Sequence, residues 1–345
     1  MKNKQYIYSI TLADLKDSLP DIQAYRYKQI INWIYNNNIY NPEKMSNIPA
    51  DIKNKLAEAF ECSLPKILKQ SKTSDKTDKY LVKLKDDETI EFVIIHSPQR
   101  KTLCLSSQVG CPVQCKFCAS GMFGLNRNLT KGEIVSQFLL ASEYIGKTPD
   151  NVVFMGIGEP LLNYNNLISA LETICSQEYF NYASRRVTIS TSGIPKYIIK
   201  LANLSQQWNL ALSLHATDDV TRSKLIPDKS RYEMEEILKS CKYYFSKTGR
   251  IITLEYTLIK DINDSTKQAK ELAGIAKNMR AKVNLIPFNK VLGCSFARPE
   301  KNACLKFASI LQSNGISFTF RLEKGNNIDA ACGQLRASNL KENIK

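Results

Sequence analysis

Hydrophobic positions recur at helical spacing near the start of the chain. In the stretch "SNIPADIKNKLAEAF", Ile52, Leu56 and Phe60 lie four residues apart, and Ser46 stands before them as a residue of the N-cap type. The stretch "RYKQIINWIYNNNIY" also mixes apolar and polar residues as a helix does. The pattern predicts a small N-terminal helical accessory domain over residues 1–60.

The pattern changes in the next segment. Two short alternating stretches, "KYLVKLKD" and "TIEFVIIH", stand among lysine, aspartate and threonine residues. Alternation with a period of two is typical of strands that bury one face. We therefore expect residues 61–100 to form linking strands in a hairpin and the start of the core.

Strand-like and helix-like segments alternate from residue 101 to the end of the chain. The strand-like runs are 102–108, 151–158, 185–193, 208–215, 251–259, 281–289 and 316–323. Helix-like segments between them include 131–146, 232–248, 265–279 and 300–314. "TKGE" (Thr130 to Glu133) has the capping-box pattern, so it predicts a helix start. Residues 101–345 thus form an α/β domain with parallel strands and crossover helices.

Polar motifs follow four of these strand-like runs. They are "GEP" (158–160), "STS" (190–192), "SLH" (213–215) and "PFN" (287–289). The carboxyl ends of parallel strands meet at one edge of a sheet, so the four motifs predict one shared site there. A doubly wound sheet would place its ligand at one switch point between two strands. Contributions from so many strands favour a full or partial β/α barrel.

Composition and charge narrow the class of protein. Hydrophobic residues make up 43% of the chain, which excludes general disorder. The formal net charge of +15 indicates a polyanionic partner such as nucleic acid, although a lysine-rich surface without a partner would give the same total. The N-terminus lacks an apolar signal region, and no apolar run is long enough to cross a bilayer. We expect a cytoplasmic protein that does not bind membranes.

Three cysteines in "CPVQCKFC" form the strongest local motif. Cys111, Cys115 and Cys118 have the spacing C-x3-C-x2-C, and the chain has only two histidines. Structural zinc needs four ligands, whereas three thiolates suit three corners of a [4Fe-4S] cluster with one iron left open. The spacing favours iron–sulfur over zinc. The isolated cysteines read as buried structural thiols: Cys62, Cys175, Cys241, Cys294 and Cys304.

The cysteine motif, with Phe117 before its last member, resembles the signature of radical S-adenosylmethionine (SAM) enzymes. Over residues 91–335 the ordered set "SSQVGCPVQCKFC", "GLNRNLT", "FMGIGEPLLN", "TISTSG", "LSLHA", "NLIPFN" and "IDAACGQL" resembles the RlmN/Cfr family of RNA methyltransferases. The N-terminal helices resemble that family more loosely. The resemblance implies a partial (β/α)6 TIM-like radical SAM barrel that uses a [4Fe-4S] cluster and S-adenosylmethionine.

The resemblance also implies roles for single residues. Cys332 would carry a methyl group, Cys104 would form a disulfide with Cys332 to release the product, and Glu91 would act as an acid or base. Taken alone, both cysteines read as buried thiols. The cluster ligands would be Cys111, Cys115 and Cys118. The implied SAM-binding residues are Gly158, Glu159, Ser190, Ser213, Leu214, His215 and Asn289, with Leu214 contributing only its backbone.

The reaction implied is methylation of C2 of adenine in 23S rRNA (adenine 2503) and in tRNA (adenine 37), with two molecules of S-adenosylmethionine. The alternative is Cfr-type methylation of C8 of the same rRNA adenine. Pro160 and Val109 differ from the Cfr residues at these positions and favour C2.

A non-catalytic RNA-binding protein with a structural metal would make Cys104 and Cys332 incidental. We expect a monomer that receives electrons from a reducing partner such as flavodoxin or ferredoxin.

Overall fold

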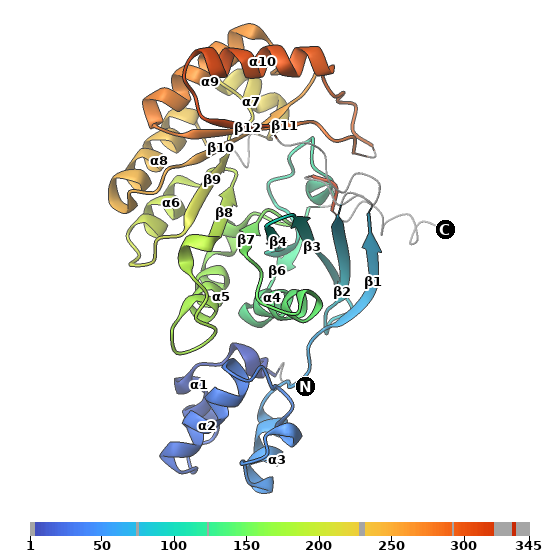
Figure 1. The fold of residues 1–345 in the computed structure, drawn as a ribbon, viewed down its shortest axis with the longest axis vertical. Coiled ribbons are helices and arrows are strands. Elements are labelled where there is room, and N and C mark those ends of the chain that lie inside the picture. The colour runs from blue at the N-terminus through green and yellow to red at the C-terminus, as the bar shows by residue number, and fades with distance from the viewer. Residues whose placement is uncertain are drawn as a thin grey trace.

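The computed structural model describes residues 4–73, 76–122, 124–227, 232–291, 293–320 and 333–335. In this part of the chain ten strands form one sheet, in the order β1-β2-β3-β4-β7-β8-β9-β10-β11-β12 (Figure 1). Their bounds are Lys66–Lys72 (β1), Thr77–Lys83 (β2), Thr89–Ser97 (β3), Arg100–Cys104 (β4), Asn151–Phe154 (β7), Val187–Thr191 (β8), Asn209–Ser213 (β9), Thr253–Leu258 (β10), Lys282–Pro287 (β11) and Phe318–Phe320 (β12).

The strands from β4 to β12 are all parallel, and they stand in the sheet in the order in which they occur in the chain. Each neighbouring pair is connected through a helix or two, as right-handed crossovers of parallel strands require. The helices are α4 (Lys131–Ile145), α5 (Tyr164–Cys175), α6 (Pro195–Ala202), α7 (Asp219–Leu225), α8 (Met234–Thr248), α9 (Thr266–Met279) and α10 (Lys301–Ser313). The predicted partial β/α barrel is confirmed.

Helix α4 begins where the capping-box pattern placed it. The Thr130 side chain accepts a hydrogen bond from the Glu133 amide, and the Glu133 carboxylate accepts one from the Thr130 amide. Ser46 was expected to cap the helix after it, but this expectation is wrong. Helix α3 (Ala50–Ala59) begins only after Pro49, which is its N-cap and which has no side-chain acceptor. Proline fixes φ at this position, at −60°, and so sets the direction in which the chain enters the helix.

Strands β1 to β4 pair in antiparallel fashion and extend the parallel sheet, so the expected hairpin is confirmed as β2 and β3. The two faces of this extension differ. One face contributes Tyr80, Phe92 and Leu103 to the main apolar core, with the Tyr80 and Phe92 rings stacked at 4.7 Å. The opposite face carries Lys79 and Glu91. Strand β1 is the edge, with Lys66, Lys69 and Lys72 exposed.

Three helices precede the sheet: α1 (Leu12–Ser18), α2 (Ala24–Tyr35) and α3. They lie at the end of the molecule opposite α9 and α10 (Figure 1). The Tyr35 ring of α2 packs against Tyr179 at 4.7 Å and Phe180 at 4.8 Å, so these helices share apolar contacts with the core. The boundary at residue 60 stays a prediction. None of the described helices combines the length and the apolar character that a bilayer crossing requires.

Candidate active site

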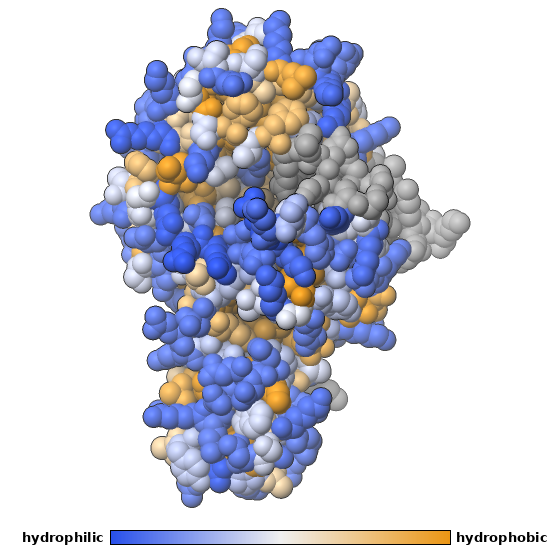
Figure 2. Space-filling model, viewed as in Figure 1, coloured by the Kyte–Doolittle hydropathy of each residue, from blue (hydrophilic) through white to orange (hydrophobic). Residues whose placement is uncertain are grey.

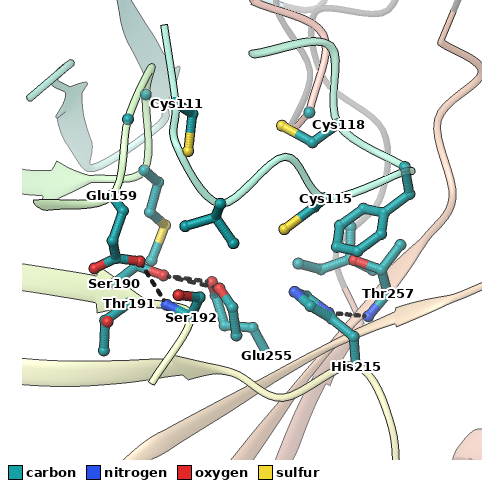
Figure 3. A pocket seen from close by; sticks show the side chains of 18 of the residues that line it. Cys111, Cys115, Cys118, Glu159, Ser190, Thr191, Ser192, His215, Glu255 and Thr257 are labelled. Carbon is teal, nitrogen blue, oxygen red and sulfur yellow. Dashed lines mark hydrogen bonds between the residues drawn. The ribbon is translucent and has the colours of Figure 1, made fainter. Parts of the chain in front are cut away.

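The three cysteines lie on one loop between β5 (Gln108–Gly110) and a short 3-10 turn, Ala119–Gly121. The loop is fixed by backbone hydrogen bonds from the amide of Cys111 to the Gly124 carbonyl (2.8 Å) and from the amide of Lys116 to the Leu225 carbonyl (2.9 Å). The loop directs the side chains of Cys111, Cys115 and Cys118 toward one cavity (Figure 3).

This cavity is where the predicted strand-end motifs meet. Its walls include the predicted SAM-binding residues Gly158, Glu159, Ser190, Ser213, His215 and Asn289 beside the three cysteines. Leu214 does not line the cavity: its side chain is fully buried, and its amide donates a hydrogen bond to the Glu255 carbonyl at 3.0 Å. The fold therefore brings together residues that are far apart in the sequence, such as Cys111 and Asn289, which are 178 positions apart.

The donor set that this cavity offers to an iron–sulfur cluster consists of three thiols. Burial is the main reason that the pKa of the Cys111 thiol is raised to about 12 and that the pKa of Cys115 is well above its ordinary value. A ligand must therefore displace protons from these thiols when it binds. Three cysteine thiolates match three corners of a [4Fe-4S] cluster.

The "GEP" segment contributes Gly158 and Glu159 to the wall of the cavity, where the Gly158 backbone packs closely against Gln108. Gly158 has a φ of +105°, and a Cβ there would lie 2.6 Å from the Cβ of Gln108, so only glycine fits without strain. Glu159 is buried, and its carboxylate accepts hydrogen bonds from the amides of Ser192 (2.7 Å) and Leu161 (3.0 Å). Burial raises the pKa of Glu159, and these two donors oppose that rise. The backbone of Glu159 is also engaged within the protein: its amide donates to the Gln108 side chain at 2.8 Å, and its carbonyl accepts a hydrogen bond from the Leu162 amide at 3.1 Å.

Glu255 is a buried carboxylate in the cavity wall that the sequence reasoning missed. One of its oxygens accepts a hydrogen bond from the Ser190 hydroxyl at 2.9 Å, and the other accepts one from the side-chain Nδ2 of Asn284 at 3.3 Å. The Ser213 hydroxyl lies 3.3 Å from that of Ser190. The only signal in the sequence is a charged residue in the middle of the apolar run "IITLEYTLI". A carboxylate here suits a ligand that carries positive charge or hydroxyl groups.

His215 enters the cavity as a neutral ring. Its Nδ1 accepts a hydrogen bond from the Thr257 amide at 3.0 Å, so the neutral ring carries its proton on Nε2 (Figure 3). Burial, and then the nearby Arg222 charge, lowers the pKa of His215 to about 3. The Phe117 ring of the cysteine loop meets the imidazole edge-on, with the ring centres 4.9 Å apart. His215 therefore serves as a hydrogen-bond donor rather than as a cation.

Two of the predicted catalytic residues lie beside the cavity rather than in its wall. Cys104 ends β4 with a buried side chain and packs with Val93, Ile157 and Leu335. Glu91 on β3 is 1% exposed and forms an ion pair with Lys79, with Nζ and Oε1 at 3.1 Å. Sequence reasoning did not single out Lys79.

The third predicted catalytic residue, Cys332, lies outside the described residues. The residue that follows it, Gly333, lines the cavity, and its carbonyl accepts a hydrogen bond from the Ala119 amide at 2.7 Å. Gln334 donates to the Lys290 carbonyl at 3.0 Å, and Leu335 is 4% exposed among the side chains around Cys104. The segment Gly333–Leu335 thus joins the cysteine cavity to the Cys104 group.

A parallel β/α sheet and a three-cysteine loop that faces the carboxyl ends of its strands together define a radical SAM protein. A family model described as the radical SAM superfamily matches residues 105–273, and one described as the ribosomal RNA large subunit methyltransferase N-terminal domain matches residues 10–62. Proteins of the radical SAM superfamily use a [4Fe-4S] cluster and S-adenosylmethionine.

Similar proteins specify the family. The chain is 43% identical over 96% of its length to a probable dual-specificity RNA methyltransferase RlmN of Clostridium beijerinckii, of which it covers 95%. It is 44% identical over 97% of its length to a protein of the same description from Dictyoglomus thermophilum, also covering 97% of that protein. A crystal structure of a radical SAM methyltransferase from Sphaerobacter thermophilus superposes with a TM-score of 0.91 at 39% identity, over 96% of this chain and 99% of that one. The chain belongs to the RlmN family of radical SAM methyltransferases.

Proposed function

We propose that this protein methylates C2 of adenine in 23S rRNA, at adenine 2503, and in tRNA, at adenine 37. One observation carries the proposal. The residue after Cys332 lines the cofactor cavity while Leu335, three residues after Cys332, packs against Cys104. A chain segment that reaches from the cofactor cavity to the Cys104 thiol suits a neighbouring cysteine that carries a methyl group and later forms a disulfide with Cys104. The names of the relatives support an RNA substrate.

The chemistry of the target explains why such a site is needed. C2 of adenine is electron-poor, so it does not attack the methyl group of a sulfonium as a nucleophile would. The cluster and S-adenosylmethionine, when bound, supply one-electron chemistry that removes a hydrogen atom from an unactivated carbon. In our proposal Cys111, Cys115 and Cys118 hold the cluster. S-adenosylmethionine is held by Gly158, Glu159, Ser190, Ser213, His215 and Asn289, with the backbone of Leu214 behind them.

The protein's own sulfur atoms perform the remaining steps. Cys332 carries the transferred carbon as a thioether. This carbon would lose one hydrogen atom to the radical that the bound cofactor supplies and then bond to C2 of the adenine. C2 would then give up its own hydrogen as a proton, taken by Cys104, and one electron, which the bound cluster would take back. The Cys104 thiolate then attacks the sulfur of Cys332, so that an S–S bond forms and the S–C bond breaks. The electron pair goes to the released carbon, which takes one proton and becomes the methyl group. Reduction of the disulfide between Cys104 and Cys332 restores the starting protein.

Position C2 is proposed over C8 on the basis of two residues near the cavity. Pro160 follows Glu159 and opens the 3-10 turn Pro160–Asn163, and Val109 is fully buried in β5 just before the cysteine loop. Both positions differ from the Cfr pattern. The alternative, methylation at C8, would give 8-methyladenosine from the same RNA.

The proposal extends to partners and location. The net charge of +15 suits a phosphate backbone, and hydrophilic side chains cover most of the face shown in Figure 2. A ribosomal substrate implies a cytoplasmic enzyme. We propose that it acts as a monomer and that flavodoxin or ferredoxin supplies its electrons.

The test is an anaerobic reaction of the cluster-loaded protein with S-adenosylmethionine, a reductant and unmodified 23S rRNA or tRNA, read by mass spectrometry of the nucleosides. We expect 2-methyladenosine from both RNAs and none from Cys332→Ala. Formation of 8-methyladenosine would support the alternative. If a cluster-loaded protein consumes cofactor but methylates neither RNA, the proposed substrate is wrong.

A further inference from the structure

A buried ion pair on the sheet extension has no part in the cofactor cavity. Lys79 on β2 and Glu91 on β3 lie with Nζ and Oε1 3.1 Å apart, and their side chains are 6% and 1% exposed. The register pairs Lys79 with Val93 and Leu81 with Glu91, so the two charged residues are diagonal neighbours on one face. Long side chains reach each other across such a diagonal.

The same face carries the Cys104 thiol. Strand β4 pairs with β3 so that Cys104 stands opposite Val93, which itself stands opposite Lys79. Residues paired in antiparallel strands share a face of the sheet. Lys79, Val93 and Cys104 therefore form one row across three strands, and Glu91 lies two residues along β3 from that row.

Stability of the sheet does not account for these two charges. Desolvation of a buried ion pair offsets most of its attraction, and a well-packed apolar pair in its place is often as stable. The opposite face of the same strands is packed with apolar side chains, with Tyr80 stacked on Phe92. Packing alone therefore does not explain why a lysine and a glutamate are buried on the Cys104 face.

We propose that Lys79 is a positioning residue for the release step: its ammonium holds the Glu91 carboxylate on the Cys104 face. This inference rests on the proposed function. Glu91 takes the thiol proton of Cys104 as the thiolate attacks the sulfur of Cys332. When the S–C bond breaks, the electron pair stays on the carbon, and the proton on Glu91 passes to that carbon to complete the methyl group. Lys79 keeps its own protons throughout.

The test compares Lys79→Met, Lys79→Arg and Lys83→Met in the cluster-loaded protein with S-adenosylmethionine, reductant and 23S rRNA. Lys83 is a matched control, because it stands on the same strand but pairs with exposed Asp87 at 2.7 Å. Three products are measured: 5′-deoxyadenosine, the RNA–protein crosslink on a denaturing gel, and methylated adenosine.

We expect Lys79→Met to release methylated RNA at least tenfold more slowly while the crosslink accumulates and cofactor cleavage stays within twofold of the wild type. Lys79→Arg should recover most of the release, because it keeps the positive charge, and Lys83→Met should behave as the wild type. Wild-type release from Lys79→Met would overturn the inference, and so would loss of product without crosslink. A wild-type protein that makes no 2-methyladenosine would count instead against the proposed function.

A double variant covers the case in which Lys79→Met fails to fold, since that change removes the ammonium that faces the buried Glu91 carboxylate. Lys79→Met combined with Glu91→Gln removes both charges. If Lys79 acts through Glu91, the double variant should release product as slowly as Glu91→Gln alone. A further tenfold loss in the double variant would show that Lys79 acts independently and would overturn the inference.

Discussion

The amide of Ala119 donates a hydrogen bond to the carbonyl of Gly333 at 2.7 Å. Ala119 directly follows Cys118, and Gly333 directly follows Cys332. This bond therefore connects the last cysteine of the cavity loop to the segment that bears the proposed methyl carrier. The position of Gly333 is therefore tied to the turn Ala119–Gly121, which directly follows the cysteine loop.

The first prediction concerns the apolar end of this segment. Leu335→Ala should lower formation of methylated RNA at least tenfold, because Leu335 is 4% exposed among Val93, Cys104 and Ile157, and truncating a buried leucine costs about 2–5 kcal/mol. Cofactor cleavage without RNA should stay unchanged, since Leu335 does not line the cavity. Leu305→Ala is the control, as that leucine is 52% exposed on α10. Equal product yields from both variants would contradict the role of Leu335.

A second prediction compares two glycines with positive φ. Gly158→Ala would place a Cβ 2.6 Å from the Cβ of Gln108, whereas Gly146→Ala meets nothing within 4 Å. The free energy of unfolding of both variants should fall by about 1–2 kcal/mol, because alanine is strained in the left-handed region of the backbone. Only Gly158→Ala should also lose binding of S-adenosylmethionine, measured by anaerobic equilibrium dialysis. Similar affinities in the two variants would show that the close approach at Gly158 is unimportant.

The third prediction concerns the buried carboxylate of Glu255. Glu255→Gln removes the charge that accepts hydrogen bonds from Ser190 and Asn284. Hydrogen bonds to a charged group contribute about 1.5–3 kcal/mol, so the Kd for S-adenosylmethionine should rise about tenfold or more. Glu236→Gln, on the exposed surface of α8, serves as the control. An unchanged Kd in calorimetry of Glu255→Gln would remove Glu255 from the binding site.

The fourth prediction concerns the protonation of His215. Because its pKa is lowered from 6.5 to about 3, the ring should stay neutral throughout the range from pH 8 to pH 5. The unfolded chain takes up this proton below pH 6.5, so the folded state loses about 2 kcal/mol of stability from this group between pH 7 and pH 5. The chain has two histidines, and NMR of the ring protons with His96→Gln for assignment would follow each one. A His215 signal that titrates near pH 6 would contradict the buried, neutral ring.

Local patterns predicted the parts of the site that follow strands directly. Ser190, Ser213 and Asn289 converge because the carboxyl ends of parallel strands share an edge, and this follows from strand order alone. Lys79 escaped notice because its importance comes from a diagonal pairing with Glu91, and register cannot be derived from one strand at a time. Glu255 was not predicted as a site residue, because a single carboxylate in an apolar run does not show toward which side of the sheet its side chain points.

The start of α3 shows a similar limit. Ser46 has the side chain of a cap, but Pro49 sets the turn three residues later, and propensity alone does not rank the two. Cys104 was assigned from the resemblance rather than from its surroundings. The structure adds that Leu335, from the far end of the chain, packs with it.

The lysines of β1 have a consequence for the behaviour of the protein at high concentration. An open sheet has edges whose unpaired backbone groups can recruit strands from other molecules. Strand β1 presents Lys66, Lys69 and Lys72 at such an edge, and its pairing with β2 is irregular between Ile67 and Lys69. Repulsion between these charges, together with the distorted backbone, disfavours hydrogen bonding of this edge strand to the edge strand of another molecule. The partial barrel can thus stay open for its RNA without becoming a template for aggregation.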